Sequence, residues 1–251
     1  MTVTIDEVTR VSAEQVRCFV NATGDNNNIH QGESPVIPCI QLALLAKRFT
    51  ERGNAALPSS HCRKIEVRCK KPLRAGDELT FYGKFERGDT IALPFSISTC
   101  ENLKASITLT YQTSPSPSTV IASDERRYRI STHQHLLTQQ RAYDVGIATN
   151  KETHDWVGLA LGSLSYALLE HGAEQTAAKA AERLKPVYLT TEFNLRPVIM
   201  RAEDPLEIIA ASRETGKNRC LAKAVARVGG EIAYYASSIL AFVPEDELAR
   251  H

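Results

Sequence analysis

The residues best suited to chemistry are an aspartate and a histidine in one short segment, Gly24-Asp25-Asn26-Asn27-Asn28-Ile29-His30. Its glycine, aspartate and three asparagines favour turns and left-handed backbone, so we expect a fixed loop. A carboxylate and an imidazole five residues apart around a turn can share a water molecule and pass its protons in turn. Asn27 offers a donor and an acceptor to steady either group. The segment therefore predicts acid–base chemistry by Asp25 and His30.

The residues after this loop favour that interpretation over a plainly structural one. In the structural alternative, Asp25 and the asparagines only cap turns while His30 packs at the start of a helix. The loop, however, runs through Ser34-Pro35-Val36-Ile37-Pro38-Cys39 into an apolar helix. The first free amides of that helix, near Cys39, should face the same cavity as the acid–base pair. Such amides can hold a carbonyl oxygen as negative charge develops on it, an effect often worth roughly 3 kcal/mol.

The elements that position this loop recur along the chain in the same order. Ser12 and Ser131 each begin a Ser-x-x-Gln capping box, 131 − 12 = 119 residues apart. Pro72 and Pro197 each introduce a strand, 197 − 72 = 125 residues apart. The other recurring segments are two apolar helices, from Val36 to Phe49 and from Trp156 to Glu170, each leading to a glycine (Gly53, Gly172), and two closing strands, 105–111 and 236–242. An internal repeat is the simplest explanation of this order.

The repeat predicts two modules, 1–117 and 118–251, joined at the proline- and serine-rich stretch from Gln112 to Thr119. Each would contain a short helix, a loop, a long apolar helix and then three or four strands. Short turns between the strands favour an antiparallel sheet, and a helix that is apolar on nearly every side must be covered all round. We therefore expect an α+β fold in which the sheet of each module wraps a central helix. The alternative is two unrelated α+β halves.

The loop resembles the hydratase-2 motif of the MaoC-like proteins, which are (R)-specific enoyl-thioester hydratases and 3-hydroxyacyl-thioester dehydratases of the hotdog fold. The motif Gly-Asp-x-Asn-Pro-Ile-His is matched at Gly24, Asp25, Asn27, Ile29 and His30, whereas an asparagine, residue 28, stands where the family has proline. The resemblance implies a double-hotdog fold. It also implies that Asp25 and His30 are catalytic, with Gly24 and Asn27 as loop support.

The continuation is similar to the His-x-x-x-x-Pro-Val-Met-Pro-Gly segment of FabZ-type and FabA-type hydroxyacyl-ACP dehydratases. It has Pro35, Val36 and Pro38, which we expect to line the substrate tunnel, and Cys39 where glycine is usual. The amide of Cys39 would be the oxyanion donor. Those dehydratases carry a carboxylate five residues further along the helix, where this chain has Leu44. Asp25 must therefore supply the carboxylate.

The activity that the resemblance implies is dehydration of a (3R)-hydroxyacyl thioester, or hydration of a trans-2-enoyl thioester, on acyl carrier protein or coenzyme A. It needs no metal and no other cofactor. Two alternatives stay open: a hotdog acyl-thioesterase and a non-catalytic acyl-binding subunit. The second module lacks the Asp-to-His spacing and is expected to be a degenerate copy, although His154 and Asp155 lie next to each other there. Two modules in one chain predict a monomeric pseudo-dimer or a homodimer.

Net charge, the lengths of apolar runs and the cysteine pattern limit the partners and the cellular location that we expect. The net charge is +1, with basic and acidic residues interspersed, so we expect no nucleic-acid partner. No apolar run approaches the roughly 18 residues that span a bilayer, and the start lacks a signal-peptide pattern. The six cysteines form no C-x-x-C pair, which favours reduced thiols in the cytoplasm.

Two sets of histidines and one set of basic residues are further candidates for a functional site. His133 and His135 are interpreted as surface residues of the second capping region, and His61 as a structural residue at a strand entry. The basic residues between the first apolar helix and the following strands are interpreted as a solvated strand face. Their alternative role is to dock a phosphopantetheine phosphate or an acidic carrier protein at a tunnel mouth. These residues are Arg63, Lys64, Arg68, Lys70, Lys71 and Arg74.

Overall fold

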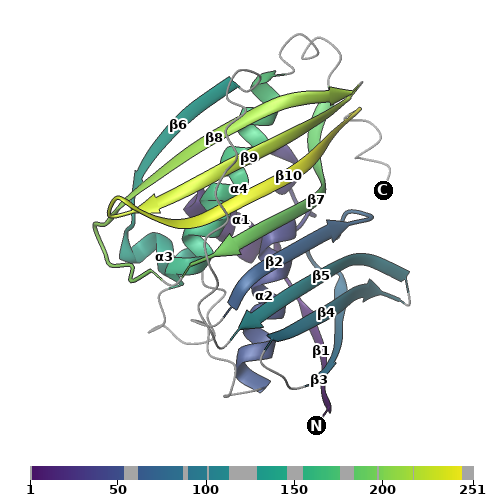
Figure 1. Ribbon diagram of the computed structural model, residues 1–251. Helices are drawn as coiled ribbons and strands as arrows, with labels where there is room; N and C mark the ends of the chain where they lie inside the picture. The colour runs from purple at the N-terminus through teal and green to yellow at the C-terminus, as the bar shows by residue number, and fades with distance from the viewer. Residues whose placement is uncertain are drawn as a thin grey trace.

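The computed structural model describes residues 2–53, 62–86, 90–100, 102–112, 129–145, 155–175, 184–196, 198–216 and 218–244. Within these ranges, two sets of elements follow the same order of strand, short helix, longer helix and four strands (Figure 1). The first set is β1 (Thr2–Arg10), α1 (Ala13–Thr23), the 3-10 turn η1 (Asn28–His30), α2 (Cys39–Gly53), β2 (Cys62–Cys69), β3 (Glu78–Glu86), β4 (Thr90–Thr99) and β5 (Asn102–Gln112). The second set is β6 (Arg129–Leu136), α3 (Gln139–Val145), α4 (Trp156–Gln175), β7 (Leu184–Leu195), β8 (Pro205–Gly216), β9 (Arg219–Val228) and β10 (Glu231–Pro244).

The strands form one antiparallel sheet in the order β1-β3-β4-β5-β2-β7-β10-β9-β8-β6. The two halves meet where β2 pairs with β7, with Glu66 opposite Glu192. The helices lie on one side of the sheet (Figure 1), where α2 contacts β2 and α4 contacts β8 and β9. The expected α+β double hotdog is confirmed. The expected boundary at 117/118 lies outside the described residues.

The expected order of elements needs one correction in each module, because each begins with a strand. Ser131 was predicted to open a helix, but it lies within β6, whose residues from 131 to 136 alternate between partly buried and exposed. The helix that follows begins after Thr138, whose Oγ1 accepts the amide of Arg141 at 3.3 Å. Thr138 and Ser12 are 138 − 12 = 126 residues apart, and each precedes the short helix of its module. The Ser-x-x-Gln pattern in β6 was a coincidence of composition.

The first module's helices follow from local signals. Ser12 caps α1 and forms both hydrogen bonds of the predicted capping box with Gln15. Helix α2 begins at Cys39 and not at Val36, because Val36 forms a bridge with Arg74 instead. It ends at Gly53 as predicted.

The second module's long helix was predicted less well at its end. Helix α4 does not stop before Gly172 but continues to Gln175. Its middle residues are fully buried, as expected for a helix covered on every side: Leu159, Ala160, Leu161, Leu164 and Leu168. No helix in the described ranges is long and apolar enough to cross a membrane.

The prediction of reduced cysteines is wrong for two residues. Cys39 and Cys69 form a disulfide, with Cα atoms 6.7 Å apart. The pairing depends on β2 ending beside the start of α2, which no spacing in the sequence reveals. Cys18, Cys62, Cys100 and Cys220 are free.

Candidate active site

The candidate catalytic loop begins where α1 ends. Gly24 caps α1 in a left-handed conformation, with φ of 81° and its amide directed at the carbonyls of Val20 and Asn21. The amide of Asp25 donates to the Val20 carbonyl at 2.8 Å. Glycine adopts this backbone conformation without the steric cost of a Cβ atom. Gly24 therefore turns the chain so that Asp25 faces inward.

Short-range hydrogen bonds hold the rest of the loop. The Asp25 Oδ1 atom accepts the amide of Asn27 at 2.9 Å, and the Asn27 carbonyl accepts the amide of His30 at 3.0 Å. The Asn27 side chain accepts the amide of Ile29 at 3.4 Å and caps η1. Asn28, which stands where the related motif has proline, is the exposed first residue of this turn. The turn forms without the proline, and Asn27 lies where a supporting residue is expected.

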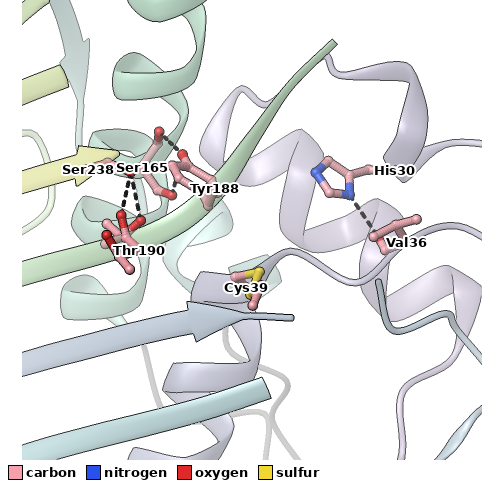
Figure 2. Close-up of a disulfide and its surroundings, with 9 residues drawn as sticks. His30, Val36, Cys39, Ser165, Tyr188, Thr190 and Ser238 are labelled. Atoms are coloured by element: carbon pink, nitrogen blue, oxygen red, sulfur yellow. Dashed lines mark hydrogen bonds between the residues drawn. A yellow bond between two sulfur atoms is a disulfide. The ribbon is translucent and has the colours of Figure 1, made fainter. Parts of the chain in front are cut away.

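The structure brings Asp25 and His30 together. The Nε2 atom of His30 lies 3.5 Å from Oδ2 of Asp25, and Nδ1 lies 2.6 Å from the carbonyl oxygen of Val36 (Figure 2). A carbonyl oxygen can only accept, so Nδ1 must carry the hydrogen. In neutral His30 the lone pair is therefore on Nε2, facing the Asp25 carboxyl group. Sequence reasoning did not foresee this role of the Val36 carbonyl.

Burial sets the electrostatics of the pair. The side chains of Asp25 and His30 are only 8% and 5% exposed. Burial raises the pKa of Asp25, while the His30 charge and the Asn27 amide partly oppose this rise. The net direction is upward, so Asp25 keeps its proton to a higher pH than a free aspartate. A buried carboxylic acid next to an imidazole with a free lone pair can donate one proton and accept another.

The residues expected to line a tunnel have backbone roles in the structure. The Pro35 carbonyl accepts the amide of Ala75 at 2.9 Å, and the amide of Ile37 donates to Leu73 at 2.7 Å. Pro35 and Pro38 are buried, and Val36 is partly buried. These contacts fix the path from His30 to α2. That Pro35, Val36 and Pro38 contact a substrate stays a prediction.

The start of α2 has backbone amides that lack an acceptor within the helix. The first hydrogen bond into the helix runs from Leu42 to the Pro38 carbonyl at 3.3 Å. The amides of the three preceding residues, Cys39 included, therefore have no acceptor within the helix. His30 lies near this helix start (Figure 2). Leu44 is buried on the same helix, so α2 has no carboxylate at the position that FabZ-type proteins use.

The second module contributes side chains that sequence reasoning missed. Tyr188 of β7 directs its hydroxyl at Ser165 of α4 (Figure 2). Its hydroxyl bonds to the Ser165 hydroxyl at 2.8 Å and donates to the Ser165 carbonyl. Tyr166 of α4 donates to Glu170 at 3.1 Å. Burial is the main cause that raises the pKa of both tyrosines, and the nearby Asp25 charge adds to the rise.

A register shift explains why Tyr188 could not be placed from the sequence. Thr190 pairs with Ile239 but Tyr188 pairs with Leu240, so residue 189 is an extra residue in β7. Thr191 and Phe193 are buried on the inner face. Strict alternation from them would put Tyr188 on the outer face, and the bulge returns it to the inner face. Bulges of this kind re-aim side chains.

The second module has no copy of the acid–base pair in the described residues. The connection that corresponds to the catalytic loop runs from α3 to α4, and residues 146–154 of it lie outside the described residues. Asp155 accepts the amide of Gly158 at 2.7 Å and so caps α4. His154 lies outside the described residues, as does His61.

His133 and His135 were predicted to lie near a helix cap, but both are in β6. Residues two apart on a strand share a face, and both histidines are partly buried on that face. His133 lies 3.2 Å from Ser131 Oγ through Nε2 and 3.7 Å from Glu170 through Nδ1. Even so, no three His, Cys, Asp or Glu side chains in the described ranges are placed to hold a metal ion.

The basic residues after α2 do not form one patch of free charges. Lys64 pairs with Glu66 at 3.3 Å and with Glu192 at 3.0 Å, at the junction of the modules. Arg74 donates to the Ser34 carbonyl at 3.0 Å and braces the segment after the catalytic loop. A docking role for these residues stays a prediction.

Comparisons with known proteins bear on the fold. No protein-family model matches the sequence, and no curated protein matches it. A MaoC-like dehydratase superposes with a TM-score of 0.64 and 12% identity, over 96% of this chain and 98% of its own. The acyl-CoA thioesterase II TesB2 from Mycobacterium marinum gives 0.58 and 15%, over 84% and 91%. The peroxisomal multifunctional enzyme type 2 from Drosophila melanogaster gives 0.60 and 13%, over 94% of this chain and 48% of its own. The chain therefore shares the hotdog fold of MaoC-like proteins and of thioesterases.

Proposed function

We propose that the protein is a hydro-lyase that removes water from (3R)-hydroxyacyl thioesters or adds it to trans-2-enoyl thioesters. The observation that carries this proposal is the buried Asp25–His30 pair beside the start of α2. The proposal is supported by the match of Gly24 to His30 with the hydratase-2 motif and by the shared fold with a MaoC-like dehydratase. It requires no cofactor.

In the direction of dehydration, the thioester carbonyl would accept hydrogen bonds from the free amides at the start of α2. The Nε2 lone pair of His30 would take the proton from the carbon next to the carbonyl. The resulting negative charge on the carbonyl oxygen would be held by those amides and by the positive end of the helix dipole. Because the Val36 carbonyl fixes the hydrogen on Nδ1, Nε2 is available as the base.

Asp25 would complete the reaction as the acid. As the carbon–oxygen bond to the hydroxyl group breaks, Asp25 gives its proton to the leaving oxygen, which departs as water. The new carbon–carbon double bond takes the electron pair of the broken carbon–hydrogen bond. Proton transfer from His30 to Asp25, across the 3.5 Å between them, restores both groups. Hydration uses the same steps in reverse.

The substrate would be an acyl thioester on coenzyme A or on acyl carrier protein. We infer that one chain suffices for the site, as a monomer or within a homodimer, because both modules contribute residues near it. We propose the cytoplasm as the location on the basis of the four free cysteines, and the Cys39–Cys69 disulfide argues against it.

A single assay set tests the proposal. Purified protein is incubated with crotonyl and longer trans-2-enoyl thioesters, and loss of enoyl absorbance and release of free thiol are followed together. Loss of enoyl absorbance without thiol release is expected. Thiol release without hydration would replace the proposal with thioester hydrolysis. Neither signal would leave acyl binding as the remaining function.

The oxyanion donor is tested by removing one amide. Cys39→Pro deletes the backbone N–H of residue 39 at a helix position that tolerates proline. It also removes the disulfide, so Cys39→Ser is the matched control, with the amide retained and the sulfur lost. We expect kcat to fall by about 10²–10³-fold in Cys39→Pro relative to Cys39→Ser. Equal kcat values would exclude this amide from the reaction.

A further inference from the structure

The second module packs against the first where α1 ends and the catalytic loop begins. The Nε atom of Arg141 in α3 donates to the carbonyl oxygen of Ala22 at 2.6 Å. Carbonyl groups in the last turn of a helix lack partners within the helix, and the helix dipole favours a cation there. Gly162 of α4 lies against Thr23, because a Cβ atom on Gly162 would be 2.2 Å from Thr23 Cγ2. The two residues that precede Gly24 are therefore both held by the second module.

Tyr166 extends this contact to the catalytic loop itself. Residues four apart on a helix lie on the same face, so Tyr166 follows Gly162 one turn further along α4. Its hydroxyl has the Asn26 side chain as a hydrogen-bond partner, and the Asp25 carboxyl group lies close enough to act on it electrostatically. The second module therefore contacts the loop at the residue that follows Asp25.

The hydroxyl hydrogen of Tyr166 is committed to Glu170 of the same helix. Tyr166 donates to Glu170 Oε1 at 3.1 Å, and Glu170 Oε2 lies 3.7 Å from Nδ1 of His133 in β6. Each carboxylate oxygen of Glu170 thus has a partner, which fixes the acceptor of the Tyr166 hydrogen. A phenol has only one hydrogen, so the oxygen of Tyr166 is left to accept from the Asn26 amide group. This direction of bonding suits a positioning role and not the role of an acid.

Asn26 lies between the residues whose hydrogen bonds shape the loop. The Asp25 Oδ1 atom accepts the amide of Asn27, and the Asn27 carbonyl accepts the amide of His30. Asn26 itself is exposed, so a side-chain partner restrains a residue that packing holds only weakly. Rotation of the backbone at residue 26 would change the 3.5 Å distance between Asp25 Oδ2 and His30 Nε2.

We propose that Tyr166 is a positioning residue of the active site, because its hydroxyl, bonded to Glu170 and to the Asn26 side chain, holds the catalytic loop so that Asp25 stays within reach of His30. This inference rests on the proposed function for the reaction that it supports. It gives the second module a defined part in the site, although its described residues contain no acid–base pair.

The test removes the two partners of this bond singly and together. Tyr166→Phe deletes only the hydroxyl, and Asn26→Ala deletes the side-chain amide. Each should lower kcat for hydration of crotonyl-CoA by roughly tenfold and change KM by less than about threefold, since a misplaced reacting group slows the chemical step. In the double variant the loss should stay near tenfold rather than approach roughly 100-fold, because both substitutions remove the same interaction. Wild-type kcat in Tyr166→Phe, or losses that multiply in the double variant, would overturn the positioning role.

Tyr234→Phe is the matched control. Tyr234 is also a tyrosine of the second module, in β10, and its hydroxyl bonds to the Met200 sulfur at 3.7 Å. Its kcat should stay within about twofold of wild type, because distant sites act independently. A fall as large as in Tyr166→Phe would mean that loss of a bonded tyrosine hydroxyl elsewhere in the module has the same effect, and would overturn the specific role of Tyr166. If circular dichroism shows that Tyr166→Phe is unfolded, Asn26→Ala takes its place.

Hydrogen exchange separates this inference from the proposed function. Exchange of the Asn27 and His30 amides, both bonded within the loop, is measured by NMR whether or not hydration is detected. These amides should exchange roughly three- to tenfold faster in Tyr166→Phe than in wild type, and at the wild-type rate in Tyr234→Phe. Faster exchange in a protein that hydrates no enoyl thioester would overturn the proposed function and leave Tyr166 as the residue that holds the loop. Unchanged exchange in folded Tyr166→Phe would overturn the role of Tyr166.

Discussion

The connection between the two helices of the first module differs from its counterpart in the second. From α1 to α2 the chain has 39 − 23 − 1 = 15 residues, and from α3 to α4 it has 156 − 145 − 1 = 10. The longer connection accommodates the turns that hold Asp25 and His30. The second module has the longer central helix: α4 has 20 residues, whereas α2 has 15.

This difference places all the groups that we propose for the reaction in the first module. The first module presents an acid–base pair and free amides, all from consecutive elements. In the second module, Tyr188 and Ser165 bond to each other from a strand and a helix that meet only in the folded chain. If this division is correct, substitutions of the reacting groups should lower kcat more than substitutions in the second module.

The largest expected effect is on the reaction itself. His30→Gln and Asp25→Asn should each lower kcat by roughly 10²–10⁴-fold, because each removes a proton donor or acceptor while nearly preserving shape. The matched change in the second module is Asp155→Asn, which retains a good helix cap. Its kcat should stay within about threefold of wild type. A loss in Asp155→Asn equal to that in Asp25→Asn would show that the second module is also catalytic.

A smaller effect is expected on stability where the modules touch. Gly162→Ala places a methyl group 2.2 Å from Thr23 Cγ2 and 3.2 Å from the Phe19 ring. We expect a loss of about 1–3 kcal/mol in the free energy of unfolding, measured by urea denaturation. Gly216→Ala is the control, since a Cβ atom there meets nothing within 4 Å. Equal stability of the two variants would mean that α4 and α1 are not in close contact.

The smallest expected effect is a pH-dependent gain in stability from Asp25→Asn. Burial raises the pKa of Asp25 above its ordinary value of 3.8 in the folded chain. The stabilisation from the retained proton is complete below the unfolded pKa and is lost as the pH rises through the folded one. The asparagine variant does not lose it. Its Tm should exceed that of wild type at neutral pH by about 2–4 °C, for a difference on the order of 1 kcal/mol.

The pH dependence of this gain in Tm tests the direction of the Asp25 pKa shift. The advantage of Asp25→Asn should shrink as the pH is lowered toward 4, where wild-type Asp25 regains its proton. An advantage that grows on acidification would mean that the folded pKa of Asp25 is lowered and that the carboxylate is stabilised by its partners.

The catalytic loop could be predicted from the sequence because its hydrogen bonds join residues that are close in the chain. The hydrogen bonds among Asp25, Asn27 and His30 span at most five residues. Turn-forming residues at that spacing determine such a loop largely by themselves. The capping box of α1 was predictable for the same reason. The order of the apolar segments also indicated the duplicated fold.

Contacts between distant segments were decided only by the tertiary structure. Strands β1 and β6 acquire partners through the sheet, and their sequences carry weak signals of their own. The Cys39–Cys69 disulfide needs β2 to end beside α2. Tyr188 faces inward because one extra residue shifts the register of β7 against β10. The sequence by itself determined the groups that could react, since those groups depend on near neighbours. Only folding decided what surrounds them, because a register shift of one residue turns a side chain from one face of a sheet to the other.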